Sequence, residues 1–478
     1  MVHAIGVVVQ TRAPRVRTFW QALAAPKPRQ TPHVHQLLHD ARVRDPLGHQ
    51  VQTVIAMLFL FTMPLSTAAA GIAFALLAFN TLLRLPHTFR CYEPPVDARS
   101  LWWMAAFVAW CAISLKWSTN RHLGFEEIGA SRVLLLPLLL WTVLDRVPWL
   151  IAAALLGVFA QNLMQVLQAT DWIQWRPHEG EGRLGGLVHP IHTGMWCTAA
   201  MIWHIMATLR SRGIVRVVSI LGFLIAGAGL IASGSRGPWL AAIIVMPLAL
   251  LVTLIRRPDV RRPAIILATA GFITAAAATP LVYPQIAQRI EQSVSEFNDA
   301  RERGVYWTSI GSRVAMTKWA CEIFASHPIQ GVGAGGYPAA QDKLIDFQNA
   351  VERLPAKRHR TMMIHQQPHS TWLYVLACTG LIGAALFACG VIVALRQCWR
   401  DPPDHLYADA AFFIMIAWII GASFDSYNLN GELWGLFALL IAITMPMRPP
   451  IRLVLSAPNE TPRTLLASSH HSADPDQS

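Results

Sequence analysis

The sequence has few charged residues for its length. Asp, Glu, Lys and Arg make up 14% of the 478 residues, whereas hydrophobic residues make up 54%. A soluble globular domain usually carries about 25% charged residues. The chain is therefore predicted to be a polytopic membrane protein. Its formal net charge of +12 does not indicate a nucleic-acid partner, because basic residues in short loops set the orientation of membrane helices.

Cysteine is also scarce, and no two cysteines form a CxxC pair, so a zinc site of that kind is not indicated. Only Cys321 lies in the longest polar stretch, which therefore cannot close a disulfide on itself. No pair of carboxylates suited to acid–base chemistry stands out, and no apolar core of a signal peptide precedes about residue 51. We expect neither a metal site nor a cofactor.

Long apolar runs, in contrast, are abundant. A membrane-spanning helix needs roughly 20 mostly apolar residues, and about twelve candidates can be counted. They cover residues 51–66, 68–83, 101–116, 131–144, 148–167, 187–209, 214–233, 239–255, 263–279, 369–395, 408–424 and 433–447. The first two are short and could form one re-entrant hairpin. The predicted fold is all-α, with about 12 transmembrane helices and one large helical loop.

Arginines cluster in alternate loops, after residues 209, 255, 395 and 447. By the positive-inside rule both termini are cytoplasmic and the long polar stretch is extracytoplasmic. The predicted organisation is a basic, largely disordered cytoplasmic tail (1–50), nine transmembrane helices (51–279), the large loop (280–367), three transmembrane helices (368–447) and a polar cytoplasmic tail (448–478).

The large loop carries two amphipathic patterns and a glycine-rich segment. Apolar residues recur at helical spacing from Ala315 to Phe324 and from Leu344 to Leu354. The segment from Gly331 to Gly336 matches GxGxxG, but no βαβ pattern surrounds it and no nucleotides are present on that side. We expect these glycines to form a tight turn that positions the following helix.

Two Gly-Ser-Arg triplets end at Arg236 and Arg313. A lone arginine at a membrane boundary can simply reach the lipid headgroups. The repeat of the triplet favours an anion site instead, because a forked guanidinium beside free backbone N–H groups binds phosphate. Ser312 is a plausible helix N-cap, which would place Arg313 in a first helical turn.

His369 follows Pro368, which suits the first turn of a helix. The positive end of a helix dipole disfavours the imidazolium, and a neutral imidazole can act as a general base. A capping or core histidine is the simpler alternative. His365 lies four residues earlier, but the proline between them argues against a metal-binding pair on one helix. After Arg183, the segment His189-Pro190-Ile191-His192 could contact a lipid phosphate or form an interfacial turn.

Several of these segments resemble the O-antigen ligase and polymerase family. The resemblance rests on Ser235-Arg236-Gly237-Pro238-Trp239, on Gly331-Val332-Gly333 with Gly336-Tyr337, and on the stretch from Pro368-His369-Ser370-Thr371-Trp372 to Thr379-Gly380-Leu381-Ile382-Gly383. Gln366 and Gln367 depart from the asparagine that many members have before this histidine. The similarity covers roughly residues 183–383.

The resemblance implies a GT-C-like glycosyltransferase of the bacterial inner membrane with its active site on the periplasmic side. The donor would be an undecaprenyl-pyrophosphate-linked O-antigen, and the acceptor of a ligase would be the lipid A–core oligosaccharide. Matching positions imply that Arg236 and Arg313 bind the diphosphate and that His369 is the base. The expected substrate-binding residues are Arg183, His189, His365, Gly333 and Tyr337.

Four functions remain open at this point. The same motifs serve the ligase, the related polymerase and a transferase that glycosylates protein on Ser or Thr. A transporter of lipid-linked glycan would need charges along a path through the membrane, whereas the notable charges here cluster on the outer side. We therefore expect a metal-independent, inverting ligase.

Overall fold

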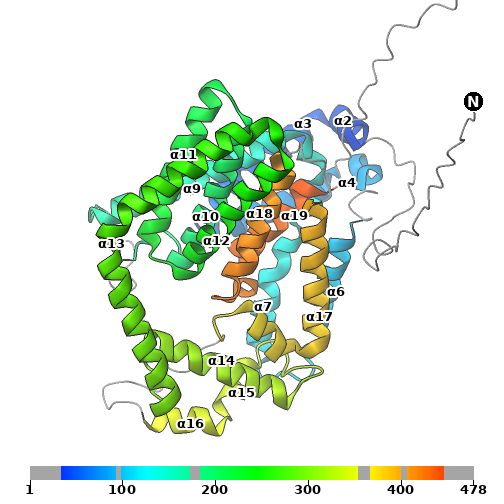
Figure 1. The fold of residues 1–478 in the computed structure, drawn as a ribbon. Helices are drawn as coiled ribbons and strands as arrows, with labels where there is room; N and C mark the ends of the chain where they lie inside the picture. Colours follow the sequence, from blue (N-terminus) through cyan, green and yellow to red (C-terminus); the bar gives the residue numbers. More distant parts are fainter. Residues whose placement is uncertain (1–33, 93–97, 173–182, 354–366, 400–405, 446–478) are drawn as a thin grey trace, which may run out of the picture.

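Every element in the described part of the chain is a helix. The computed structural model describes residues 34–92, 98–172, 183–353, 367–399 and 406–445 (Figure 1). The first part of the chain forms α2 (Val34–Arg44), α3 (Pro46–Thr62), α4 (Thr67–Thr88), η1 (Phe89–Tyr92), α6 (Arg99–Ser114), α7 (Arg121–Ala130), η2 (Ser131–Leu135), α8 (Leu136–Leu140), η3 (Trp141–Arg146), α9 (Val147–Ala169) and α10 (Pro190–Arg210).

The second part continues with α11 (Gly213–Ser233), α12 (Arg236–Arg256), η4 (Pro258–Val260), α13 (Arg261–Arg303), α14 (Ser309–Ser326), α15 (Tyr337–Asp342), α16 (Ile345–Glu352), α17 (Thr371–Trp399), α18 (Leu406–Gly421), η6 (Tyr427–Leu429) and α19 (Gly431–Thr444). Five helices in the described part are long and apolar enough to cross a membrane: Thr67–Tyr92, Arg121–Ala169, Gly213–Ser233, Arg236–Arg256 and Thr371–Trp399. The architecture is consistent with an all-α membrane protein. The count of about twelve spans and the side on which the loop lies stay predictions.

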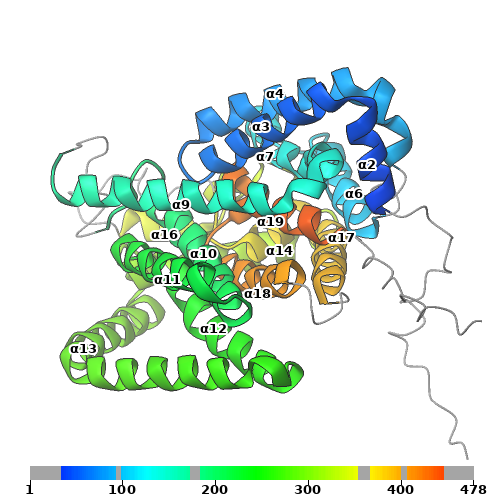
Figure 2. The ribbon, with the colours of Figure 1, turned by 90° about the horizontal axis from the view of Figure 1, so that it is seen from above.

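The centre of the bundle is formed by α10, α18 and α19. Nearly every residue of α10 and α19 is buried, as expected for helices that are apolar on all sides and enclosed by others. In Figure 2 these helices lie between α3, α4 and α9 on one side and α12 and α13 on the other. In contrast, α11 exposes an apolar face that includes Ile214, Val218 and Leu224, which suits contact with lipid.

Two amino-terminal predictions need correction. Residues 131–144 are not one regular α-helix but the consecutive short pieces η2, α8 and η3, which lie within the helical stretch Arg121–Ala169, with Pro137 at the start of α8. Proline lacks the N–H that would continue the preceding helix. Residues 34–50 are not a disordered tail, because α2 is helical and its Leu38 and Ala41 are buried. Residues 1–33 lie outside the described residues.

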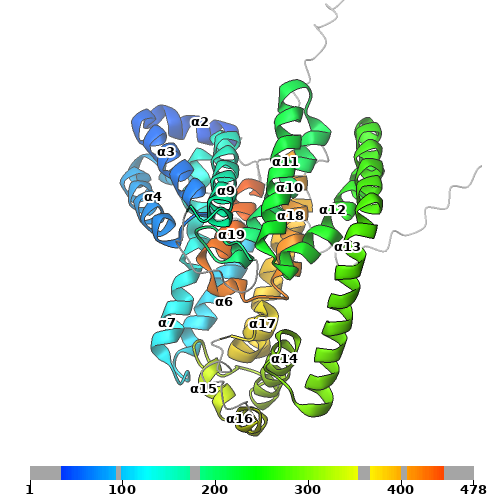
Figure 3. The same cartoon turned by 90° about the vertical axis from the view of Figure 1, so that its left-hand side faces the viewer.

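The predicted start of the large loop falls inside a helix. Helix α13 runs from Arg261 to Arg303 and passes residue 280 without interruption. It leads from the bundle to a separate layer formed by α14, α15 and α16 (Figures 1 and 3). The predicted apolar stripe of α14 is confirmed: Ala315, Met316 and Trp319 are buried and pack with Phe347 of α16.

The glycine-rich segment is a tight turn, as predicted, and it is locked to a break in α17. Gly331, Gly333 and Gly335 all have positive φ. In α17, Gly380 has φ 62° and ψ −165°, a conformation that only glycine adopts readily. The break frees backbone groups that the turn then pairs with: the N–H of Val332 donates to the carbonyl of Ala377 (3.0 Å). Two segments that carry the family resemblance therefore form one packing unit.

Candidate active site

His369 pairs with a carboxylate that the sequence analysis did not single out. Its Nδ1 lies 3.1 Å from Oδ1 of Asp425, and the two side chains are 36% and 6% exposed. His369 has φ 47° and lies one residue before Ser370, whose hydroxyl accepts from the N–H of Leu373 at 3.5 Å. Pro368 consequently lies before the helix and not in its first turn, which corrects the prediction.

Asp425 is fixed by the beginning of α17. The N–H of Thr371 donates to the carbonyls of Ala422 (2.8 Å) and Asp425 (3.1 Å), and the N–H of Ser426 donates to Oδ1 of Asp425 (2.9 Å). Burial alone would raise the pKa of Asp425. The hydrogen bond with His369, the charges of His369 and His192, and the Ser426 N–H outweigh burial and hold this pKa below its ordinary value. Asp425 is therefore a carboxylate at neutral pH.

The two predicted arginines approach this pair from different elements. Arg236 is the first residue of α12 and is exposed, and Arg313 is half-buried in α14. Neither guanidinium has a hydrogen bond or an ion pair to any residue in the described ranges. The N-cap of α14 is Thr308, whose hydroxyl accepts from the N–H of Gly311 at 3.0 Å. Ser312 is thus not the cap, and Arg313 lies beyond the first turn.

The charges around Arg313 place the arginines and Asp425 in one region. Burial, the positive charge of Arg236 and that of Arg183 lower the pKa of the Arg313 guanidinium, whereas the negative charge of Asp425 opposes the shift. Several positive charges close together repel one another and favour binding of an anion. Arg236, Arg313 and Arg183 therefore lie in one region with Asp425, the partner of His369, and the catalytic roles of Arg236, Arg313 and His369 stay predictions.

Arg183 stabilises the turn that precedes Arg236. Its guanidinium donates to Oγ of Ser235 at 3.2 Å, and a Cβ added at Gly234 (φ +58°) would lie 3.0 Å from Cγ of Arg183. On the other side of the turn, a Cβ added at Gly237 would lie 3.0 Å from Cβ of Phe424. The Arg236 turn is therefore packed between the Arg183 segment and the turn that carries Asp425.

A row of amides on α9 holds the Arg183 segment in place. Gln161 donates to the carbonyl of Gly185 at 2.5 Å, and Gln165 donates to the carbonyl of Leu184 at 2.7 Å. Gln168 accepts from the N–H of Gly186 at 2.9 Å. These residues were not among those predicted from the sequence, although three glutamines at spacings of four and three on an apolar helix are a recognisable pattern.

His189 acts as the N-cap of α10, where its Nδ1 accepts from the N–H of Ile191 at 3.2 Å. This matches the interfacial-turn alternative, and the predicted substrate contact stays a prediction. Three residues on, His192 lies 2.8 Å from Oε2 of Glu432 in α19. His192 was named in the sequence only as part of the segment from His189 to His192, and Glu432 was not singled out.

The remaining predicted substrate-binding residues lie in packing positions or outside the described ranges. The N–H of Gly333 donates to the carbonyl of Cys378 at 2.8 Å, and a Cβ there would meet the backbone of Ser114 and Ser118. Tyr337 is fully buried, with its ring 6.1 Å from that of Tyr374. Their binding roles stay predictions. His365 lies outside the described residues.

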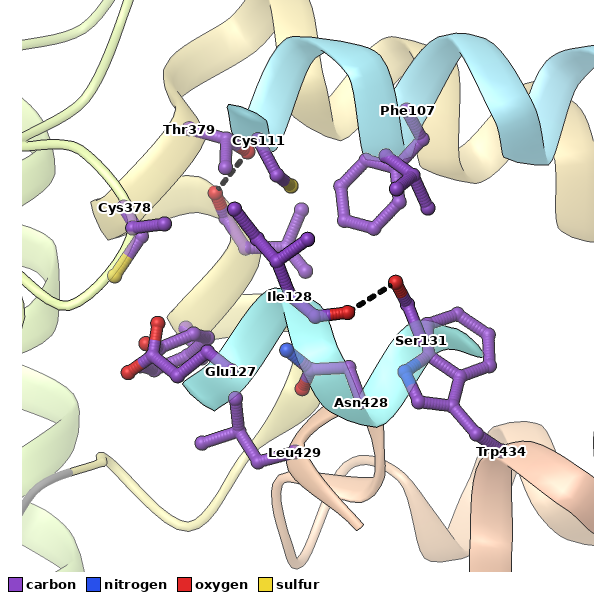
Figure 4. Close-up of a pocket in the computed structure, with 14 residues that line it drawn as sticks. Phe107, Cys111, Glu127, Ile128, Ser131, Cys378, Thr379, Asn428, Leu429 and Trp434 are labelled. Atoms are coloured by element: carbon purple, nitrogen blue, oxygen red, sulfur yellow. Dashed lines mark hydrogen bonds between the residues drawn. The ribbon is translucent and has the colours of Figure 1, made fainter. Parts of the chain in front are cut away.

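A pocket lies beside the packing unit formed by the glycine-rich turn and the break in α17. Figure 4 shows its lining from α6, α7, α17 and the segment from η6 to α19. It contains Glu127, whose Oε2 accepts from the N–H of Gly335 at 2.7 Å. It also contains Asn428, which lies three residues after Asp425. None of the predicted catalytic residues lines it. Within the described ranges, no group of three or more His, Cys, Asp or Glu residues could hold a metal ion.

The fold and the site are consistent with a helical membrane protein that carries a histidine–carboxylate pair near Arg236 and Arg313, two arginines without a hydrogen bond or ion pair within the described ranges. A family model described as O-antigen ligase matches residues 221–388. This match supports the assignment of the chain to the O-antigen ligase family and confirms the resemblance noted in the sequence. The matched stretch contains Arg236, Arg313 and His369 and ends before Asp425. No curated protein matches the chain.

Proposed function

We propose that the protein is an O-antigen ligase, which transfers a glycan from undecaprenyl pyrophosphate to a hydroxyl of the lipid A–core oligosaccharide at the periplasmic face of the inner membrane. The observation that carries the proposal is the His369–Asp425 pair beside Arg236 and Arg313, two guanidinium groups without a partner in the described ranges. The family match supports lipid-linked glycan transfer as the class of reaction.

The proposed reaction is one displacement. The acceptor hydroxyl oxygen forms a bond to the anomeric carbon of the donor glycan, and the bond from that carbon to the diphosphate oxygen breaks. His369 takes the hydroxyl proton. Because Nδ1 faces Asp425, the proton of the neutral ring lies on Nδ1 and Nε2 carries the lone pair that accepts. A single displacement inverts the anomeric configuration.

The leaving group is a lipid diphosphate, which is stable as an anion and needs no separate acid. It gains negative charge as the bond breaks, and Arg236 and Arg313 stabilise that charge. Removal of one such group commonly costs about 10²- to 10³-fold in kcat. The step requires neither a metal ion nor a cofactor.

The proposal is tested by deletion of the gene and analysis of lipopolysaccharide on a gel. For a ligase, we expect loss of the long glycan and accumulation of lipid-linked polymer, both reversed by the wild-type chain but not by His369→Ala. A product with a single capped repeat would identify a polymerase instead. Normal lipopolysaccharide with unglycosylated protein would identify a protein transferase, and lipid-linked glycan retained on the cytoplasmic side would identify a transporter.

A further inference from the structure

A second histidine–carboxylate pair lies beside the first. His192, in the first turn of α10, is 12% exposed, and its Nδ1 lies 2.8 Å from Oε2 of Glu432, which is 5% exposed. The other oxygen of Glu432 accepts a hydrogen bond from the hydroxyl of Thr67. Both carboxylate oxygens are thus engaged, and His192 is the cation that pairs with Glu432 within the described ranges.

The contact with His192 offsets the cost of burying the carboxylate of Glu432. A buried carboxylate is costly unless a positive charge compensates it, and Thr67 supplies only a neutral hydrogen bond.

The second nitrogen of His192 is available to a ligand. Nδ1 is occupied by Glu432, and Nε2 lies on the opposite side of the ring. Nε2 has no hydrogen-bond partner among the described residues. It also differs from the fully buried side-chain atoms that lack a partner, because it is not one of them. The charge of His192 also acts on Asp425. His192 therefore belongs to the same charged region as the arginines.

We propose that the imidazolium form of His192, paired with Glu432 through Nδ1, is a further binding residue for the diphosphate of the lipid donor. The inference rests on the proposed function, because it assumes that this site takes a lipid diphosphate. Nε2–H of His192 donates a charge-assisted hydrogen bond to a phosphate oxygen. It adds a positive contact from α10 to those of α12 and α14.

The test is binding of undecaprenyl diphosphate and undecaprenyl monophosphate to the full chain in nanodiscs. The variant is the double substitution His192→Gln with Glu432→Gln, which removes the positive charge without leaving a buried carboxylate unpaired. His204→Gln, on the same helix three turns further on, is the matched control. Arg236→Ala tests the site itself, and thermal unfolding of each variant checks the fold.

We expect the double variant to lose at least about tenfold in diphosphate affinity, with a smaller loss for the monophosphate and none for His204→Gln. If Arg236→Ala loses diphosphate affinity and the double variant does not, the role of His192 is overturned and the proposed function stands. An equal loss for both lipids would also overturn the role of His192, because that result indicates a packing role. Equal affinity of the wild type for both lipids, unaffected by Arg236→Ala, would overturn the proposed function as well.

Discussion

His369 and Asp425 are 56 positions apart in the chain, yet Nδ1 of one lies 3.1 Å from Oδ1 of the other. The contact joins the segment before α17 to the turn after α18, and the hydroxyl of Thr371 donates to the carbonyl of Asp425 and accepts from the N–H of Tyr427 in that turn. A base at His369 therefore depends on a carboxylate that orients its ring and fixes which nitrogen carries the proton.

Asp425→Asn should lower the transfer rate by about 10- to 100-fold, in line with the roughly 1.5–3 kcal/mol of a hydrogen bond to a charged group. The pKa of Asp425 is held below its ordinary value, so the wild-type carboxylate stays ionised at neutral pH and stabilises the imidazolium. Single-turnover kinetics of the variant measures the loss, and a wild-type transfer rate in Asp425→Asn contradicts the pairing.

Arg236→Ala and Arg313→Ala should each lower kcat/KM for the lipid-linked donor by about 10²- to 10³-fold. The physical reason is loss of a positive charge beside the leaving diphosphate. Arg216→Ala is the matched control. Arg216 lies near the start of α11, at the end of that helix away from Arg236, and donates to the carbonyl of Ser211. Steady-state kinetics at fixed acceptor concentration measures the effect. Wild-type kinetics in both variants would remove the diphosphate role.

Gly380→Ala should destabilise the fold. The backbone conformation of Gly380 costs other residues about 1–3 kcal/mol, and an added Cβ would lie 2.3 Å from the carbonyl oxygen of Ile329. Gly227→Ala in α11 is the control, because its Cβ would approach Cε of Met201 at 3.5 Å, an ordinary contact. Thermal unfolding in detergent should show a lower Tm for Gly380→Ala alone. Equal Tm values would show that the break in α17 is not required.

Chelation should leave transfer unchanged. In the proposed reaction the arginines neutralise the diphosphate, and His369 accepts the proton without assistance from a metal ion. Activity is measured with and without EDTA and after addition of divalent cations. Loss of activity in EDTA that an added metal restores would contradict this prediction and support metal binding by His365 and His369.

Hydropathy located the helices well because burial in lipid requires long apolar runs, and most predicted runs fall on a helix. The exceptions are local: Pro137 interrupts one run, and α13 continues from an apolar into a polar sequence without a break. A helix can continue from apolar into polar sequence, so composition alone could not show where α13 ends.

The site was predicted only in part. Arg236, Arg313 and His369 are marked by local motifs, and the structure groups them. Asp425 and Glu432 carry no local motif, and His192 was marked only as part of the segment from His189 to His192; the pairing of these residues arises from contacts between distant helices. Asp425 lies in a short turn and Glu432 in a first helical turn, where an acidic residue is unremarkable. Only the packing of α10, α17, α18 and α19 shows that their partners are histidines.

The most direct test of the account is transfer by the purified chain, with lipid-diphosphate-linked glycan as donor and lipid A–core as acceptor, compared between the wild type and His369→Gln. Donor binding is measured on the same samples. The account predicts that the wild type forms the glycosylated lipid and that His369→Gln binds donor normally but transfers about 10²- to 10⁴-fold more slowly, the usual contribution of a general base. Transfer at the wild-type rate by His369→Gln would contradict it.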